Sequence, residues 1–297
     1  MISIIVCSRH PEIPDEFAQN IRESIGCAFE LVWIDNSSKR YSITQAYNLG
    51  IERSIYPYLL FLHDDVMMRS DKWGLQLIAH LDDPTTGIIG VAGTELVTRI
   101  PASWSAGFTH THFIQSDRTG RKPTVLQQTP SMVGNVRKQA VMLDGVLLGM
   151  TKELAVKLSF DQRLSGFHGY DLDITLASHL AGYRNCVVGD ILLEHFSRGV
   201  PDRHYYLNLN HVYRKWGKQL PTMVDGLQEK LNAELPKIER KRLTTLRNRM
   251  IRLGFSMHVV KDSIGYWNHH AEQKVRCSIV DLLLLRLFTS PKHLFKK

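Results

Sequence analysis

The sequence predicts an α/β protein in which helices flank a mostly parallel sheet. Three short apolar runs, at 2–7, 29–34 and 58–62, alternate with two amphipathic helical segments. Strands and helices that alternate in this way form βαβ units, whose strands lie parallel in one sheet. The run at 2–7 is apolar almost throughout, as expected for a strand that is covered on both faces.

The helices between these strands have recognisable ends. Asp15 can cap a first helix, which Gly26 then ends. Ser42 and Gln45 form a capping-box pattern at the start of a second helix. After the third strand, the segment 73–81 is expected to form another helix.

Later segments are less regular. We expect strands at 87–93, at 141–150 and at 186–194. The segment 99–137 is rich in Thr, Ser, Gly, Pro and His and is expected to be irregular. A long irregular insertion is either a functional loop or an inert surface loop, so this segment is a candidate lid. A short helix to Leu158 and a longer one after Asp171 complete this part of the chain.

The sequence becomes more polar, more basic and more helical in pattern after about residue 200. We therefore expect a domain at 1–200 and a helical, basic region at 201–297. The net charge is +8, and between Arg214 and Arg252 basic residues outnumber acidic ones by eleven to four. Such an excess suits nucleic acid, an anionic membrane or a phosphorylated substrate, and it equally suits solvated helix faces.

Composition and missing motifs exclude several classes. Neither the dinucleotide fingerprint nor the P-loop follows any strand, so NAD and Walker-type ATP binding lose their main support. Four scattered cysteines without a CxxC pair argue for a reducing compartment and against a structural zinc site. Because no basic leader or long apolar run occurs, we expect a cytoplasmic protein.

Polar side chains gather where the predicted strands end. Ligands of open α/β sheets bind beyond the carboxyl ends of the strands, and carboxylates placed there repel one another unless a cation lies between them. Mg²⁺ and Mn²⁺ accept carboxylate, water and phosphate oxygens, and Mn²⁺ also accepts imidazole. The sequence therefore predicts a diphosphate site built on a metal, although Asp-rich turns and helix N-termini also occur without any ligand. The residues concerned are Asp35, His63, Asp64, Asp65, Asp144, Asp171 and His195.

Five motifs occur in an informative order. The opening strand at 2–7 is followed by WIDNSS at 33–38, AYNLGI at 46–51, FLHDDV at 61–66 and FHGYDLDI at 167–174. Together they resemble GT-A fold glycosyltransferases, in particular the inverting family-2 enzymes of bacteria. The resemblance covers about residues 2–197. It implies a GT-A, Rossmann-like sheet and a nucleotide-sugar donor, with a UDP-sugar favoured.

The resemblance also implies roles for single residues. Asp171 is the expected general base, and Asp65 and His195 are the expected ligands of Mn²⁺ or Mg²⁺. The sugar and acceptor pocket is expected at Asp144, Gly145, His168 and Tyr170. The expected nucleotide-binding residues are Cys7, Ser8, Arg9, Asp35, Asn36 and Asp64.

Two positions depart from the family pattern. His63 stands where the DXD motif has its first aspartate, which leaves the pattern HDD. Tyr170 replaces the familiar glutamate before Asp171. The departures concern the metal shell and the acceptor side of the site.

The resemblance implies a metal-dependent, inverting, hexosyltransferase-like enzyme of polysaccharide biosynthesis. Its acceptor would be a hydroxyl of a surface glycan or of a lipid-linked saccharide. No nucleic acid is expected as a partner, and the oligomeric state is open. The basic C-terminal region suggests peripheral contact with the inner face of the membrane, whereas packing or dimerisation explains its leucine-rich tail at 279–288 equally well.

Two alternatives stay open. A catalytically degenerate GT-A-like protein would bind a polyanion or a partner through its basic C-terminal region. A nucleotidyltransferase on a similar scaffold would attack phosphorus and release pyrophosphate, so its products would differ from those of a sugar transferase.

Overall fold

The computed structural model describes the chain except residues 118, 120, 198 and 290–297. The chain forms two compact units. The first comprises Met1–Val97 and Trp104–Val200, and the second joins Thr98–Ser103 to the chain from Pro201 onward. The expected domain at 1–200 thus included a six-residue segment, 98–103, that belongs to the second unit.

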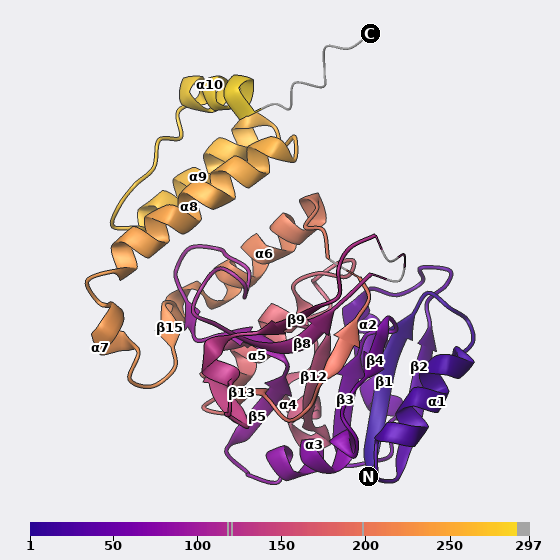
Figure 1. Ribbon diagram of the computed structural model, residues 1–297. Coiled ribbons are helices and arrows are strands. Elements are labelled where there is room, and N and C mark those ends of the chain that lie inside the picture. Colours follow the sequence, from indigo (N-terminus) through magenta and orange to yellow (C-terminus); the bar gives the residue numbers. More distant parts are fainter. Residues whose placement is uncertain (118, 120, 198, 290–297) are drawn as a thin grey trace. The chain divides into compact units, whose positions relative to one another are not determined.

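A seven-stranded sheet forms the centre of the first unit (Figure 1). The strands lie in the order β10-β13-β5-β12-β3-β1-β2. Five of them run parallel, while β10 and β12 run antiparallel to their neighbours. The mostly parallel α/β sheet predicted from the sequence is therefore confirmed. The strands are β1 (Ile2–Ser8), β2 (Phe29–Asp35), β3 (Tyr58–Leu62), β5 (Thr86–Gly90), β10 (Arg137–Ala140), β12 (Leu147–Thr151) and β13 (Arg184–Val188).

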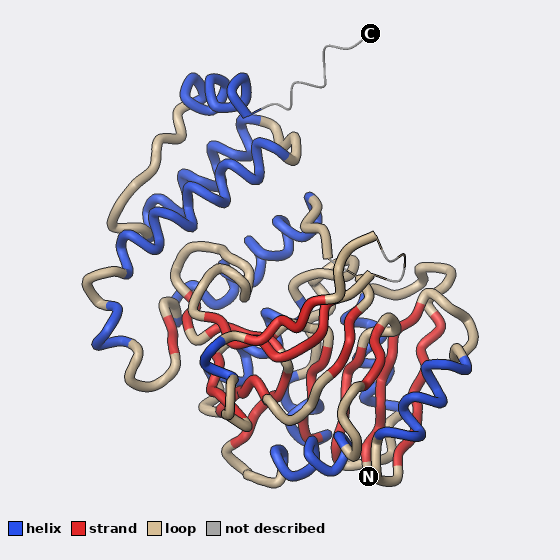
Figure 2. The backbone as a smooth tube through the Cα atoms, viewed as in Figure 1, coloured by secondary structure: helices blue, strands red, loops and turns tan. Residues whose placement is uncertain are grey.

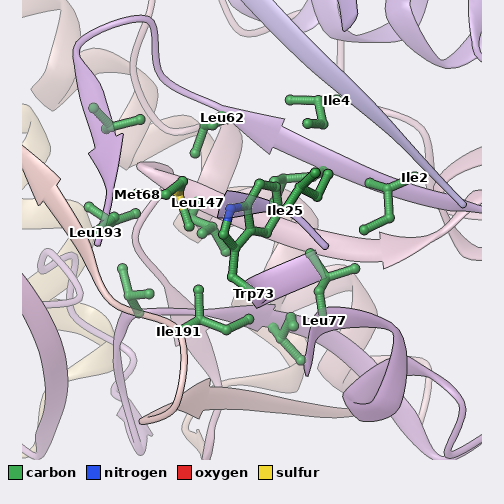
Figure 3. Close-up of a cluster of buried hydrophobic side chains, with 14 of the residues drawn as sticks. Ile2, Ile4, Ile25, Leu62, Met68, Trp73, Leu77, Leu147, Ile191 and Leu193 are labelled. Carbon is green, nitrogen blue, oxygen red and sulfur yellow. The ribbon is translucent and has the colours of Figure 1, made fainter. Parts of the chain in front are cut away.

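Helices pack on both faces of this sheet. Alternate residues of each strand point to opposite faces, so Leu60 and Leu62 of β3 belong to one core and Leu59 and Phe61 to the other. Trp73 is fully buried in the first core and donates from Nε1 to Ser24 Oγ at 2.8 Å (Figure 3). The first core lies under α1 (Asp15–Ser24) and α3 (Trp73–Leu81), and the second lies under α2 (Ile43–Arg53), α4 (Lys152–Leu158) and α5 (Tyr170–Leu180).

Two residues of the AYNLGI motif have structural roles in α2. A Cβ on Gly50 would lie 2.3 Å from Ile5 Cγ2, so glycine allows the helix to approach β1 closely. The Asn48 side chain donates to Phe160 O and accepts from Phe160 N, both at 2.9 Å. The predicted capping box of Ser42 and Gln45 is present at the start of this helix.

A second sheet takes two of its strands from the segment 99–137, which was expected to be irregular. The two strands lie at 109–115 and 125–128, and the other described residues of the segment up to 136 are mostly loop and turn. His110 is buried in the first of them, against Glu95 and Ser131. The strand expected at 186–194 is two strands, one in each sheet. The second sheet has the order β11-β6-β8-β14-β4, with β9 beside β8. Its strands are among those drawn in red in Figure 2. Its strands are β4 (Val66–Met68), β6 (Ala92–Thr94), β8 (Thr109–Gln115), β9 (Val125–Gln128), β11 (Met142–Leu143) and β14 (Leu193–His195).

The second unit is mainly helical. Its charged residues are partly internal: Glu239 is fully buried and pairs with Arg99, and the buried Arg242 donates to Thr98 Oγ1 at 2.9 Å. These contacts explain why 98–103 belongs to this unit. No helix among the described residues is long and apolar enough to cross a membrane. The helices are α6 (Arg203–Trp216), α7 (Gln228–Leu231), α8 (Leu235–Arg252), α9 (Met257–His270) and α10 (Ile279–Thr289).

Candidate active site

The register of the central sheet brings several strand ends together. Ser8 at the end of β1 pairs with Asp35 at the end of β2, and β3 runs parallel beside β1. The antiparallel β12 starts at this same edge, because Leu147 pairs with Leu62. The turn that contains Asp144 and Gly145 therefore lies beside the segment that follows β3.

The segment after β3 meets the end of β14. Val66 pairs with His195 in the second sheet, and Phe196 N donates to Asp65 O at 3.0 Å. Asp65 Oδ1 consequently lies 3.4 Å from His195 Nε2 and 3.7 Å from His63 Nδ1. One ligand atom from each of these three residues lies within 4.8 Å of the others. Among the described residues, this is the group suited to holding a metal ion.

The electrostatics of this group favour a cation. Burial raises the pKa of the Asp65 carboxyl, but a hydrogen bond to His195 and the charge of that residue lower this pKa by more than burial raises it. The net result is a pKa well below the usual range, so Asp65 is ionised at neutral pH. Burial and the neighbouring His195 lower the pKa of His63, which keeps that imidazole neutral. A carboxylate and two imidazoles fit a divalent metal such as Mn²⁺.

Ser8 and Arg9, two of the predicted nucleotide-binding residues, both contact the carboxylate of Asp64. Ser8 Oγ donates to Asp64 Oδ2 at 2.7 Å, and the backbone nitrogen of Arg9 lies 3.4 Å from the same oxygen. Asp35 is exposed at the end of β2, where Ser37 N donates to its carboxylate at 2.9 Å. Hydrogen bonds from Ser37 hold the pKa of Asp35 below its usual value. Asp35, Asp64 and the Arg9 side chain are thus available to a ligand at this edge.

Asn36 and Cys7 are more internal than the sequence suggested. Asn36 is buried, and its side chain exchanges two 2.9 Å hydrogen bonds with the backbone of Tyr41. It therefore shapes the loop after β2, and its contact with the nucleotide stays a prediction. Burial raises the pKa of the half-buried Cys7 thiol to about 11, so this side chain is neutral.

Asp171 lies in the first turn of α5 and contacts the turn that contains Asp144 and Gly145. Its Oδ2 accepts from Gly145 N at 3.2 Å. Burial, and then the charge of Asp144, raise the pKa of Asp171 to about 7. Asp144 itself accepts from Val146 N at 2.9 Å. A carboxyl group with a pKa near neutrality suits proton transfer.

The other two residues of the predicted acceptor pocket flank this aspartate. His168 is half-buried just before the helix, and Gly169 at the N-cap has a positive φ of 82°. Tyr170 is buried, and its hydroxyl lies 3.0 Å from His63 Nε2. Tyr170 therefore faces the metal-ligand group, whereas the sequence placed it only at the acceptor.

Sequence reasoning counted His63 among the polar groups at this edge but did not name it as a metal ligand. The HDD pattern was treated as a departure from the DXD motif, although the structure places His63 within the group of Asp65 and His195. An imidazole ligand of Mn²⁺ was expected at His195 and not at His63. The partnership of Ser8 with Asp64 had no local signal, because the two residues are far apart in the chain.

The mostly parallel sheet, with carboxylates and imidazoles at its carboxyl edge and a second sheet beside it, has the architecture of the GT-A fold. Residues 3–199 match the family described as "Glycosyltransferase like family". The chain belongs to this family and is a glycosyltransferase. No curated protein sequence matches the chain.

Solved structures agree with the fold. The structure of S. aureus TarS 1–349 in complex with UDP-GlcNAc has 12% sequence identity and a TM-score of 0.56, over 97% of this chain and 88% of that one. The complex of the same TarS segment with UDP gives the same values. GalNAc-T7 with UDP, GalNAc and Mn²⁺ has 14% identity and a TM-score of 0.50, over 73% of this chain and 49% of that one. Similarity at these identities concerns the fold.

Proposed function

We propose that the protein transfers a sugar from a nucleotide-diphosphate sugar to an acceptor hydroxyl, with inversion and with a divalent metal. The observation that carries the proposal is the placement of two unlike carboxylates at one sheet edge. Asp65 is ionised beside two imidazoles, and Asp171 has a pKa near neutrality beside Asp144. The family and the nucleotide-bound relatives support a nucleotide-sugar donor, and a UDP-sugar is favoured.

The donor would bind at the ends of β1, β2 and β3. Asp35 is exposed where it can meet the base or the ribose, and Asp64 is fixed by Ser8 for a similar contact. Asp65 and His195 would hold Mn²⁺ or Mg²⁺. A bound metal ion would neutralise the charge that gathers on the departing diphosphate.

Asp171 would act as the general base. As the acceptor oxygen attacks the anomeric carbon, its proton passes to the Asp171 carboxylate, and the bond from that carbon to the diphosphate oxygen breaks. Attack and departure take place on opposite faces of the carbon, so the anomeric configuration inverts. The Gly145 N–H orients the carboxylate for this transfer.

The acceptor would be a glycan or a lipid-linked saccharide met at the cytoplasmic face of a membrane. In the second unit, α10 exposes Val280, Leu283 and Leu284, at helical spacing. Basic residues of α8, among them Lys237, Arg240 and Lys241, line a shallow hollow of about 390 Å³. Apolar and basic side chains of this kind suit an anionic lipid surface.

The membrane contact is tested by sedimentation with vesicles of anionic or of neutral lipid. We expect the protein to bind anionic vesicles, and Leu283→Ser with Leu284→Ser to weaken that binding. Val259→Ser, at another exposed apolar position of this unit, is the matched control. Equal binding by all variants, or no binding to anionic vesicles, would remove the membrane from the proposal.

The central test is a thermal-shift panel of nucleoside diphosphates and their sugars, with and without Mn²⁺. A ligand that binds only the folded state raises the melting temperature according to its occupancy. We expect a metal-dependent shift with one nucleotide, lost in Asp65→Asn. The product's anomeric configuration, read by NMR, then tests inversion, and release of pyrophosphate would indicate a nucleotidyltransferase. No shift with any nucleotide, in a folded sample, would favour the degenerate binding protein.

A further inference from the structure

The two nitrogens of His63 face different partners. Nδ1 points toward Asp65, 3.7 Å from Oδ1, on the side where His195 also lies. Nε2 lies 3.0 Å from the hydroxyl oxygen of Tyr170. That hydroxyl in turn donates to Gly145 O at 3.2 Å.

One arrangement of protons satisfies all of these groups. A carbonyl oxygen only accepts, so the single hydroxyl proton of Tyr170 goes to Gly145 and its oxygen accepts from His63 Nε2–H. His63 Nδ1 is then unprotonated and presents a lone pair to the space beside Asp65. The opposite tautomer would leave Gly145 O without this donor and would direct an N–H toward a carboxylate 3.7 Å away, beyond hydrogen-bond distance.

The surroundings hold Tyr170 in this position. Its ring packs against Tyr47 and Phe160, with centroid distances of 5.5 and 6.2 Å. Gly145 leaves room for its hydroxyl, because a Cβ at that position would lie 2.1 Å from the oxygen. The tyrosine hydroxyl is therefore a fixed partner for the imidazole.

We propose that His63 Nδ1 is a third metal ligand and that Tyr170 is the positioning residue that fixes the tautomer of His63. The site then prefers Mn²⁺ and Co²⁺ to Mg²⁺. This inference rests on the proposed metal-dependent transfer and adds its ligand set and metal preference. Two imidazoles and one carboxylate suit metals that accept nitrogen, whereas Mg²⁺ prefers oxygen ligands and water. Outer partners that orient a ligating histidine typically contribute 10- to 100-fold in metal affinity.

The test is metal binding by the whole chain in the absence of substrates. Free Mn²⁺ is measured by electron paramagnetic resonance, Co²⁺ by its visible absorption, and Mg²⁺ by competition with Co²⁺. Tyr170→Phe keeps the ring and removes the hydroxyl, so we expect its Kd for Mn²⁺ to rise about 10- to 100-fold. Tyr58→Phe is the matched control, because Tyr58 donates to the exposed Asp82 near the other end of β3 and should leave binding unchanged.

A second variant tests the ligand itself. His63→Asp exchanges a nitrogen for an oxygen donor, so the preference for Co²⁺ over Mg²⁺ should shrink by about tenfold or more, and the Co²⁺ spectrum should change. Nitrogen-15 NMR of the metal-free protein should show the His63 proton on Nε2 in the wild type. A proton on Nδ1 would overturn the proposal.

The outcomes separate this inference from the proposed function. If Asp65→Asn loses Mn²⁺ while Tyr170→Phe and His63→Asp bind as the wild type does, the role of His63 is overturned and the metal-dependent transfer stands. If the wild type binds neither Mn²⁺ nor Co²⁺, with or without UDP, the metal-dependent transfer falls as well.

Discussion

The segment after β3 and the first turn of α5 bring carboxylates to the same edge of the sheet, but into opposite surroundings. Asp65 lies between two imidazoles, and His195 holds its pKa well below the usual range. Asp171 is half-buried near a second carboxylate, Asp144, and its pKa is raised to about 7. The same side chain is thus suited to hold a cation in one place and to accept a proton in the other.

Exchange of Asp65 for asparagine should have the largest effect. We expect the transfer rate to fall roughly 1,000-fold or more, because neutralisation of a leaving group by a metal contributes several kcal/mol. The measurement is the initial rate of nucleoside diphosphate release at saturating Mn²⁺. Asp82→Asn, at an exposed carboxylate near the start of β3, is the control. A rate within tenfold of wild type would contradict the metal role.

Asp171→Asn should separate chemistry from binding. Loss of a general base typically lowers kcat by about 100- to 10,000-fold. The KM for the donor should stay close to that of the wild type, since Asp171 contacts the Gly145 turn and not the metal-ligand group. Steady-state kinetics with varied donor measure both constants. A raised donor KM with an unchanged kcat would place Asp171 on the donor side instead.

Asp65→Asn and Asp171→Asn should also change the free energy of unfolding in opposite directions in metal-free buffer. Asp171 has a folded pKa of about 7 against an ordinary value of 3.8, so its ionisation destabilises the fold increasingly as pH rises from about 4 to about 7. Asp171→Asn should therefore raise the free energy of unfolding at pH 8 by up to about 4 kcal/mol, since the shift is about three pKa units and each unit corresponds to about 1.4 kcal/mol. Little difference is expected at pH 4.

Asp65 has a lowered pKa, so its charge stabilises the fold above pH 4, and that contribution is lost as pH falls. Asp65→Asn should consequently destabilise the protein at pH 8. Urea unfolding of both variants at pH 4 and pH 8 measures these effects. If both variants changed the free energy of unfolding with the same sign at pH 8, the opposite surroundings assigned to Asp65 and Asp171 would be contradicted.

The smallest effect concerns the pH profile. With Asp171 as base, the rate should rise with pH and level off above about 7. Asp144→Asn removes a negative charge that raises the pKa of Asp171, so the acid limb should move toward lower pH. Rates measured from pH 5 to pH 9 for both proteins check the shift. An unmoved limb would mean that another group sets the profile.

Local patterns were enough to predict the elements that carry the donor side. Helix α3 begins at Trp73 and ends at Leu81, as its sequence predicts, and the expected capping box of Ser42 starts α2. These features depend on hydrogen bonds and apolar spacing within a few residues. The order of strands and helices was likewise sufficient for the mostly parallel sheet.

Non-local pairing explains what the sequence did not reveal. His195 meets Asp65 because β14 pairs with β4, and no local pattern encodes that register. Tyr170 reaches His63 across 107 residues of chain, so its contact with the metal-ligand group could not be read from the FHGYDLDI motif. The second sheet was missed for the same reason, since strand β8 is largely polar and is stabilised by its neighbours.

The most direct test of the two unlike carboxylates is calorimetric titration of UDP in the presence of Mn²⁺. Wild type, Asp65→Asn and Asp171→Asn would be measured side by side at pH 8. We expect Asp171→Asn to bind UDP with the affinity of the wild type and Asp65→Asn to lose the metal-dependent part of binding. Equal affinities in both variants, or a loss confined to Asp171→Asn, would contradict the division of roles between the two ends of the site.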